Sequence, residues 1–252
     1  MPKHPLLLLA TLFAITQAKA APLTPATEAP ATTKTDPASP PKIQKIAKNA
    51  DIEPIQPKNQ APTPSEALEM LMHGNKHFAD GEITHLSYIT EAKDKMLEKQ
   101  TPFAVIIGCS DSRVPPELIF DRGLGDLFVV RDAGNVIGPI ELDSVEFAVE
   151  KLKAPLIMVL GHQNCGAVRA ALVGRHHVPE LESIYPLIDS GLKSCKETAK
   201  DVLINAIYCN VKKGMDTLKK SPTIAPLLAK NKVKIVGAYF NIETGIVTII
   251  SE

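Results

Sequence analysis

Three short apolar runs constrain the fold of this 252-residue chain more than any other feature. They cover Phe103 to Gly108, Leu127 to Val130 and Leu156 to Gly161, and turn or glycine signals bound each of them. The runs have the length of β-strands and are mostly unalternated, as expected for parallel strands that are covered on both faces. Helix-like segments follow the second run, at Asp143 to Leu152, and the third, at Gly166 to Val173. This alternation predicts an α/β fold with a central, mostly parallel β-sheet flanked by helices.

Further elements are expected on both sides of these runs. The sequence Thr63-Pro64-Ser65-Glu66 has capping-box spacing and predicts a helix from about Pro64 to Phe78. The C-terminal part is expected to contain a long helical stretch from about Leu192 to Leu218, a shorter one near Thr223 to Ala229, and two strands, Lys234 to Phe240 and Ile246 to Ile250, joined through Glu243-Thr244-Gly245.

The first twenty residues have the pattern of a secretory signal peptide. Lys3 and His4 precede an apolar run from Leu6 to Ile15, and Ala18-Lys19-Ala20 supplies small residues before a cleavage site at Ala21. The apolar run has about ten residues, half of the ~20 that a membrane-spanning helix needs, so a membrane anchor is disfavoured. We therefore expect an exported protein, periplasmic or secreted, with no membrane span in the mature chain.

Residues 21–62 are expected to form a Pro-rich disordered linker. Twelve of the 21 prolines fall at or before Pro64, and the segment has almost no aromatic residues with which to build a core. The remaining residues, 63–252, are enough for one domain with a full core that needs no disulfide.

The charge balance excludes one broad class of function. The chain has 28 basic and 28 acidic side chains, so it offers no general electrostatic surface for nucleic acid or anionic lipid. Chemistry on a small molecule is left open.

Residues suited to metal binding follow two of the predicted strands. Cys109-Ser110-Asp111-Ser112-Arg113 follows the first run, and the third ends in Gly161-His162-Gln163-Asn164-Cys165-Gly166. Ligand-binding residues collect at the carboxyl ends of strands in open α/β sheets, so two thiols, an imidazole and a carboxylate are expected to converge. Two cysteines, one histidine and an exchangeable fourth position form one type of catalytic zinc site.

The cysteines also allow other interpretations. Cys109 alone is compatible with simple core packing, and a disulfide between Cys109 and Cys165 is conceivable in an oxidising compartment. The joint pattern at two strand ends favours a metal site, because the acidic Asp111 stands two positions after Cys109 and the basic Arg113 stands four positions after it. If Cys195 and Cys209 share one continuous helix, they lie about 21 Å apart, beyond the roughly 7 Å limit for a bridge. We therefore expect them to be buried free thiols, with an intersubunit bridge as the alternative.

The motifs of residues 63–252 together resemble those of the β-class carbonic anhydrases, of the periplasmic or secreted bacterial type. The resemblance rests on Gly74-Asn75-x-x-Phe78, Gln100-x-Pro102, Cys109-x-Asp111-x-Arg113-Val114-x-Pro116-Glu117, Phe120-Asp121-x-Gly123-x-Gly125-Asp126-Leu127-Phe128-Val129-Val130-Arg131, Ala133-Gly134-Asn135, Gly161-His162-x-x-Cys165-Gly166 and Val236-Gly237-Ala238-Tyr239 before Thr244-Gly245.

The resemblance implies reversible hydration of CO₂ to bicarbonate and a proton, through a zinc-bound hydroxide, in a homodimer or homotetramer. It implies one Zn²⁺ per chain, held by Cys109, His162 and Cys165. Asp111 would be the gate, able to act as a fourth ligand, and Arg113 would be its partner. The implied substrate-binding residues are Gln100, Phe128, Ala133 and Gly166.

Two departures and two rival functions accompany the resemblance. His77 stands where the family usually has an arginine, and we expect it on a helix surface. The chain has no tryptophan, whereas the bicarbonate-inhibited subgroup has one just before the first ligand, so the unregulated subgroup matches better. One rival function keeps the metal but uses CS₂ or COS as substrate. The other is a binding module with structural zinc, which would not need Asp111 and Arg113.

Overall fold

The computed structural model describes residues 61–84, 99–174, 178–194 and 201–252. Every described residue belongs to one compact unit, Glu53–Glu252. The predicted signal peptide and all but the last two residues of the predicted linker lie outside the described residues, so both stay predictions. No helix in the described ranges is long and apolar enough to cross a membrane.

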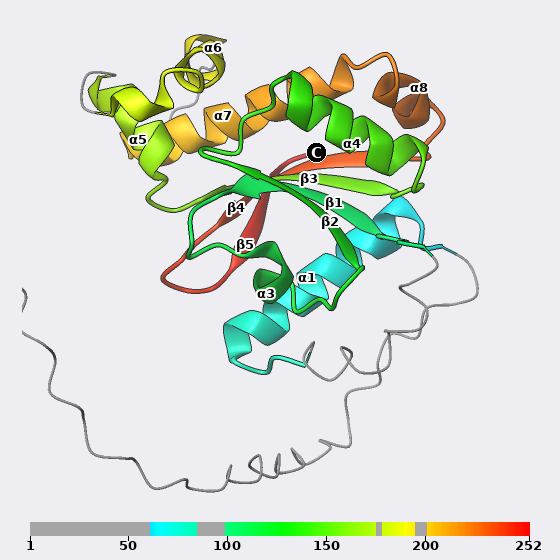
Figure 1. The fold of residues 1–252 in the computed structure, drawn as a ribbon. Coiled ribbons are helices and arrows are strands. Elements are labelled where there is room, and N and C mark those ends of the chain that lie inside the picture. Colours follow the sequence, from blue (N-terminus) through cyan, green and yellow to red (C-terminus); the bar gives the residue numbers. More distant parts are fainter. Residues whose placement is uncertain (1–60, 85–98, 175–177, 195–200) are drawn as a thin grey trace, which may run out of the picture. The chain divides into compact units, whose positions relative to one another are not determined.

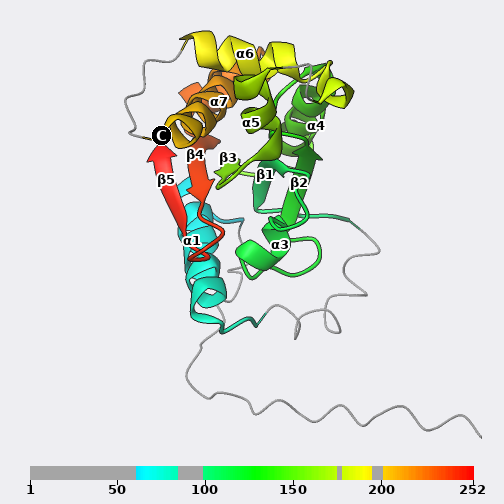
Figure 2. The ribbon, with the colours of Figure 1, turned by 90° about the vertical axis from the view of Figure 1, so that its left-hand side faces the viewer.

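Five strands form one sheet in the order β2-β1-β3-β4-β5 (Figures 1 and 2). The first four strands are parallel, and β5 is antiparallel to β4. This confirms the predicted sheet. The strands are β1 Ala104–Cys109, β2 Leu127–Asp132, β3 Leu156–His162, β4 Lys234–Phe240 and β5 Val247–Ser251.

Helices cover both faces of the sheet (Figure 1). One face packs with α1, where Ile106 and Met158 join Leu71 in a buried cluster. The other face packs with α4, α7 and α8, where Val105 and Val159 are fully buried. The helices are α1 Pro64–Asp80, α3 Pro116–Ile119, α4 Pro139–Glu150, α5 Gly166–Val173, α6 Tyr185–Ser194, α7 Val202–Lys219 and α8 Ile224–Ala229, with a short 3₁₀ turn at Pro179–Leu181.

The first helix begins as its capping box predicts. The Thr63 hydroxyl accepts from the Glu66 amide at 3.3 Å, and the Glu66 carboxylate accepts from the Thr63 amide at 2.8 Å. His77 near its end is not a free surface residue, because its Nδ1 lies 3.1 Å from the buried Asp121 carboxylate.

The buried side chain of Asn75 ties α1 to two distant parts of the chain. Its amide nitrogen donates to the carbonyls of Ile119 and Gly245, at 3.1 and 2.9 Å. Its oxygen accepts from the Val247 amide at 2.8 Å, so all of these bonds run to backbone groups.

Two glycines let α7 lie directly on β3 and β4. A Cβ added at Gly161 would be 2.8 Å from a methyl carbon of both Ile207 and Val211. A Cβ added at Gly237 would be 2.6 Å from the Met215 sulfur. Larger residues would therefore push the helix away from the sheet.

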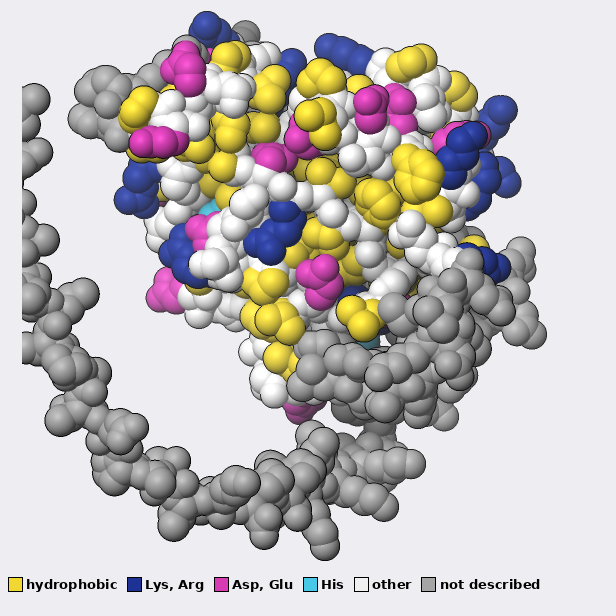
Figure 3. Space-filling view, viewed as in Figure 1, with side chains coloured by type: hydrophobic (Ala, Val, Ile, Leu, Met, Phe, Trp, Pro, Cys, Tyr) yellow, Lys and Arg dark blue, Asp and Glu magenta, His cyan; other side chains and the backbone are white. Residues whose placement is uncertain are grey.

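Strand β2 differs from the expectation that all three apolar runs are covered on both faces. It is the edge strand, and most of its residues are only half-buried. The adjoining helix α4 carries Ile140 and Phe147, which are 78% and 48% exposed. Figure 3 shows apolar side chains gathered on this face of the molecule. The single chain therefore leaves an apolar face uncovered along β2 and α4.

The predicted continuous helix from Leu192 to Leu218 is wrong. Helix α6 ends at Ser194, and α7 begins at Val202 with Asp201 as its cap, whose carboxylate accepts from two amides of the first turn. The distance argument against a disulfide therefore loses its premise, and Cys209 is disulfide-bonded rather than a free thiol. Cys195 lies outside the described residues.

The close approach of α7 predicts opposite effects for two identical substitutions. Gly161→Ala should lower the free energy of unfolding by about 1–3 kcal/mol, because the new methyl group overlaps α7. Gly166→Ala at the start of α5 meets no atom within 4 Å and should raise it by up to about 1 kcal/mol through the unfolded state. Urea denaturation of both variants measures the difference, and a Gly161→Ala protein as stable as Gly166→Ala would contradict this packing.

Candidate metal centre

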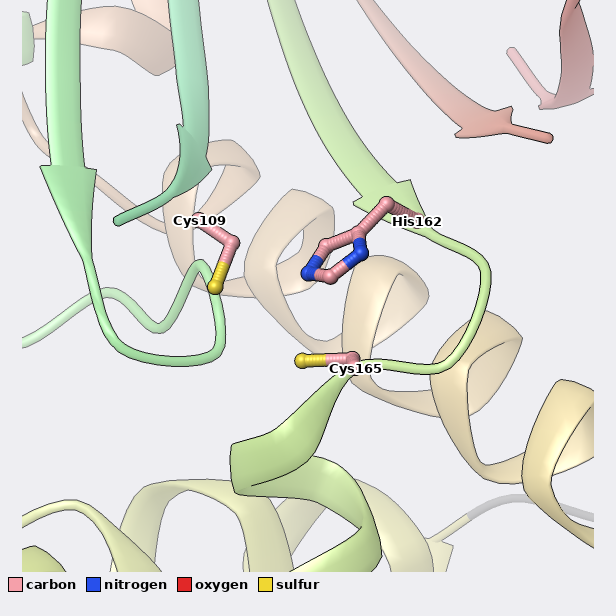
Figure 4. A group of neighbouring side chains, drawn as sticks. All are labelled: Cys109, His162 and Cys165. Atoms are coloured by element: carbon pink, nitrogen blue, oxygen red, sulfur yellow. The ribbon is translucent and has the colours of Figure 1, made fainter. Parts of the chain in front are cut away.

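Three buried side chains point toward one another at the carboxyl ends of β1 and β3 (Figure 4). Cys109 is the last residue of β1, His162 is the last residue of β3, and Cys165 caps the start of α5. Their sulfur and nitrogen ligand atoms all lie within 4.8 Å of one another. The predicted convergence of two strand ends is confirmed.

The imidazole of His162 is oriented as a metal ligand requires. Its Nδ1 lies 2.9 Å from the Gln163 carbonyl oxygen, which can only accept, so Nδ1 carries the proton. The lone pair is then on Nε2, which is buried and has no hydrogen-bond partner in the described part of the chain. A backbone carbonyl that fixes the tautomer in this way is a common feature of zinc-binding histidines.

The two thiols are free, so the alternative disulfide between Cys109 and Cys165 is absent. A hydrogen bond from Cys165, together with one from the Gly134 amide, lowers the pKa of Cys109. The same neighbour and burial raise the pKa of Cys165. The pair thus holds one thiolate readily before any metal binds, and thiolate is the form that ligates zinc. Two thiols and one free imidazole nitrogen form a donor set that suits Zn²⁺.

Asp111 stands beside this group but is held by Arg113. The guanidinium donates from Nε to one carboxylate oxygen at 2.9 Å and from Nη2 to the other at 2.7 Å, and the Arg113 amide adds a third bond at 3.0 Å. These bonds lower the pKa of Asp111 to about 2. The carboxylate is therefore ionised and paired in the structure, and it is not one of the three clustered ligands.

The predicted substrate-binding residues fall into two sets. Gly166 is exposed beside Cys165 with open space in front of its Cα, and Ala133 follows β2 in the turn that contacts Cys109. Phe128 pairs with Val105, about 13 Å along the strand from the ligand end, and its ring lies against a helix α4 side chain. Gln100 is exposed and precedes the amino end of β1. Within one chain, Gly166 and Ala133 therefore lie near the clustered side chains, whereas Phe128 and Gln100 do not.

Sequence reasoning missed two side chains that hold the site. Arg131 donates to the carbonyls of Cys109 and Asp111, at 2.9 and 2.7 Å. Asn210 of α7 donates to the Gly134 carbonyl at 2.7 Å, and the Gly134 amide donates to the Cys109 sulfur at 3.3 Å. One signal was available, since Asn210 is a polar residue four positions from the buried Ala206 and Gly214 on one helix face.

Comparison with known proteins agrees with this geometry. A protein-family model described as carbonic anhydrase matches residues 104–247. A carbonic anhydrase of Mycolicibacterium smegmatis is 38% identical over 190 residues, which cover 72% of this chain and 91% of that protein.

Solved structures of β-carbonic anhydrases share the fold. The enzyme from Coccomyxa, solved in complex with acetazolamide, is 25% identical with a TM-score of 0.56 and covers 73% of this chain and 86% of that one. A tetrameric enzyme from Sordaria macrospora is 26% identical with a TM-score of 0.51 and covers 73% and 97%. The family match spans both strands that carry the ligands, and a relative agrees along nearly its whole length, so the chain belongs to the β-carbonic anhydrases, a family of lyases.

Proposed function

We propose that this protein catalyses the reversible hydration of CO₂ to bicarbonate and a proton, with one Zn²⁺ held by Cys109, His162 and Cys165. The observation that carries the proposal is the buried, unpartnered Nε2 of His162, which faces two free thiols in the described residues. A buried polar atom without a partner costs about 1–3 kcal/mol, and a metal ion would remove that cost.

The three protein donors leave a coordination position for chemistry. When bound, zinc supplies Lewis acidity that makes a nucleophile from water at neutral pH. Two thiolates balance the charge of the ion, so the group as a whole attracts no anion strongly. The substrate CO₂ is small and uncharged, and the open space at Gly166, next to Cys165 in the chain, suits it.

Asp111 and Arg113 supply orientation and a gate in this proposal. While Arg113 holds both carboxylate oxygens, Asp111 can accept a hydrogen bond from the attacking water and orient it. If Asp111 left Arg113, it could take the fourth position on the metal and close the site. Bidentate guanidinium–carboxylate pairs are about twice as strong as neutral hydrogen bonds, so Arg113 can compete with the metal.

The apolar face along β2 and α4 supports assembly with further copies of the chain. Phe128 and Phe147 lie there with ring centroids 6.4 Å apart, and Ile140 is more exposed still. Edge strands and large apolar patches are usually covered in stable proteins. The tetrameric relative from Sordaria macrospora agrees with a homodimer or homotetramer.

Cys165→Ser should reduce bound zinc from one ion per chain to nearly none, because serine is a poor zinc ligand. Metal content of the purified folded protein measures this. Ser110→Ala, beside Cys109 but outside the ligand group, is the control and should keep its zinc. Full zinc occupancy in Cys165→Ser would remove the ligand assignment.

Arg113→Ala should keep its zinc and lower kcat about a hundredfold, because Asp111 loses its orienting partner. Wild-type activity should rise from mildly acid to alkaline pH. The pKa of Asp111 at about 2 keeps its carboxylate ionised throughout this range, so the rise does not come from titration of Asp111 and reports deprotonation of the attacking water. CO₂ hydration assays across this range are the measurement. Arg169→Ala, which removes an arginine bonded to Asn164 instead, should stay near wild type. Near-normal turnover in Arg113→Ala would refute the gate.

Phe147→Glu should shift the protein to a smaller assembly, because a buried carboxylate at the β2 and α4 face costs several kcal/mol. Light scattering coupled to gel filtration measures the mass. Leu172→Glu places the same charge at an exposed apolar residue of α5 and should leave the mass unchanged. A wild-type protein that is monomeric would contradict the assembly.

A further inference from the structure

A buried asparagine on α7 reaches the turn that contacts the metal site. Asn210 is 3% exposed on a helix face that is otherwise mostly apolar. Burying an amide is unfavourable unless it is hydrogen-bonded, and the bond it makes is to the Gly134 carbonyl at 2.7 Å. The chain therefore holds a polar group in its core in order to fix one peptide.

The same glycine also donates a hydrogen bond to Cys109, one of the proposed zinc ligands. The amide on the other side of the Gly134 Cα donates to the Cys109 sulfur at 3.3 Å. Gly134 has a φ of 90°, a conformation that residues with a side chain rarely adopt, and an added Cβ would lie 3.1 Å from the Ala167 methyl group. The position of the Gly134 amide thus depends on the backbone conformation of Gly134. Asn210, which lies on α7, holds that backbone from another element.

Two further bonds hold the same turn from its own strand. The Asp132 carboxylate accepts from the Val136 amide at 2.8 Å, and the Asp132 carbonyl accepts from the Asn135 amide at 3.4 Å. The Ser110 amide, which follows β1, donates to the same Asp132 carbonyl at 2.8 Å, so the start of the turn is also tied to β1, but none of these bonds holds Gly134 from outside the two strands. The bond from Asn210 adds that constraint, because α7 packs on β3 and β4 rather than on β2.

We propose that Asn210 is a positioning residue for the metal: through Gly134 it aims an N–H at the Cys109 thiolate and so strengthens zinc binding. The inference rests on the proposed zinc site. Outer hydrogen-bond partners of metal ligands typically change metal affinity 10–100-fold when they are mutated. An N–H that bonds the sulfur fixes its direction and stabilises its negative charge.

Asn75 provides a matched control for a purely structural role. It is also 3% exposed, and its amide also donates to backbone carbonyls, those of Ile119 and Gly245. Its hydrogen bonds run to Ile119, Gly245 and Val247, and none of them reaches Cys109, His162 or Cys165. Loss of either asparagine should lower stability, but only loss of Asn210 should change the metal site.

The experiment compares Asn210→Leu and Asn210→Asp with Asn75→Leu and Asn75→Asp in the full chain. Leucine keeps the volume and aspartate keeps the shape, and both remove the amide donor. Zinc affinity is measured by chelator competition, and Co²⁺ is used as a second probe through its thiolate-to-metal absorption band. Only the folded fraction from gel filtration is measured. If the leucine variant does not fold, the zinc affinity of the aspartate variant tests the proposal.

The Asn210 variants should bind zinc about tenfold or more weakly and shift the Co²⁺ band, while the Asn75 variants stay within about twofold with an unchanged band. Wild-type affinity and spectrum in folded Asn210 variants would overturn the proposal. Equal weakening in the Asn75 variants would also overturn it, because affinity would then follow stability. If the proposed zinc site itself is wrong, the result differs from both of these outcomes, because Cys109→Ser would bind zinc as tightly as the wild-type protein.

Discussion

The parallel pairing of β1 with β3 is the interaction on which the site depends. Both strands are buried on both faces, and their carboxyl ends bring Cys109 and His162 together before any metal binds. Each fully buried isoleucine, such as Ile106 or Ile157, contributes about 1.5–3 kcal/mol. The cost of the unpartnered His162 nitrogen, about 1–3 kcal/mol, is of the same size as the contribution of one such side chain.

Helix α7 couples this sheet to the ligand turn. The absence of side chains at Gly161 and Gly237 brings the helix against β3 and β4, and the same approach places Asn210 within reach of Gly134. A change that moved α7 outward would therefore disturb the core and the hydrogen bond near Cys109 together. Packing and metal geometry are not separate properties of this fold.

The sequence predicted the strands and the convergence of Cys109, His162 and Cys165 because unalternated apolar runs and residues at strand ends are local patterns. It could not predict that β2 is an edge strand, because strand order is absent from the apolar pattern. Helical periodicity continues across the break before Val202, so the Asp201 cap was overlooked. The roles of Arg131 and Asn210 were invisible because their partners are backbone carbonyls, which every residue carries. The gate remains a prediction, since the structure holds only the paired state of Asp111.

The bonds of Asn75 have a consequence for how the chain is made. Its acceptor and donor partners include Gly245 and Val247, 170 and 172 residues further along, so α1 cannot complete its contacts while the ribosome still holds the C-terminal strand. Contacts of such sequence separation form slowly, because the loop must close before they contribute. A nascent chain of this protein therefore stays incompletely folded until β5 has left the ribosome, and the docking of β5 is the step that closes the domain.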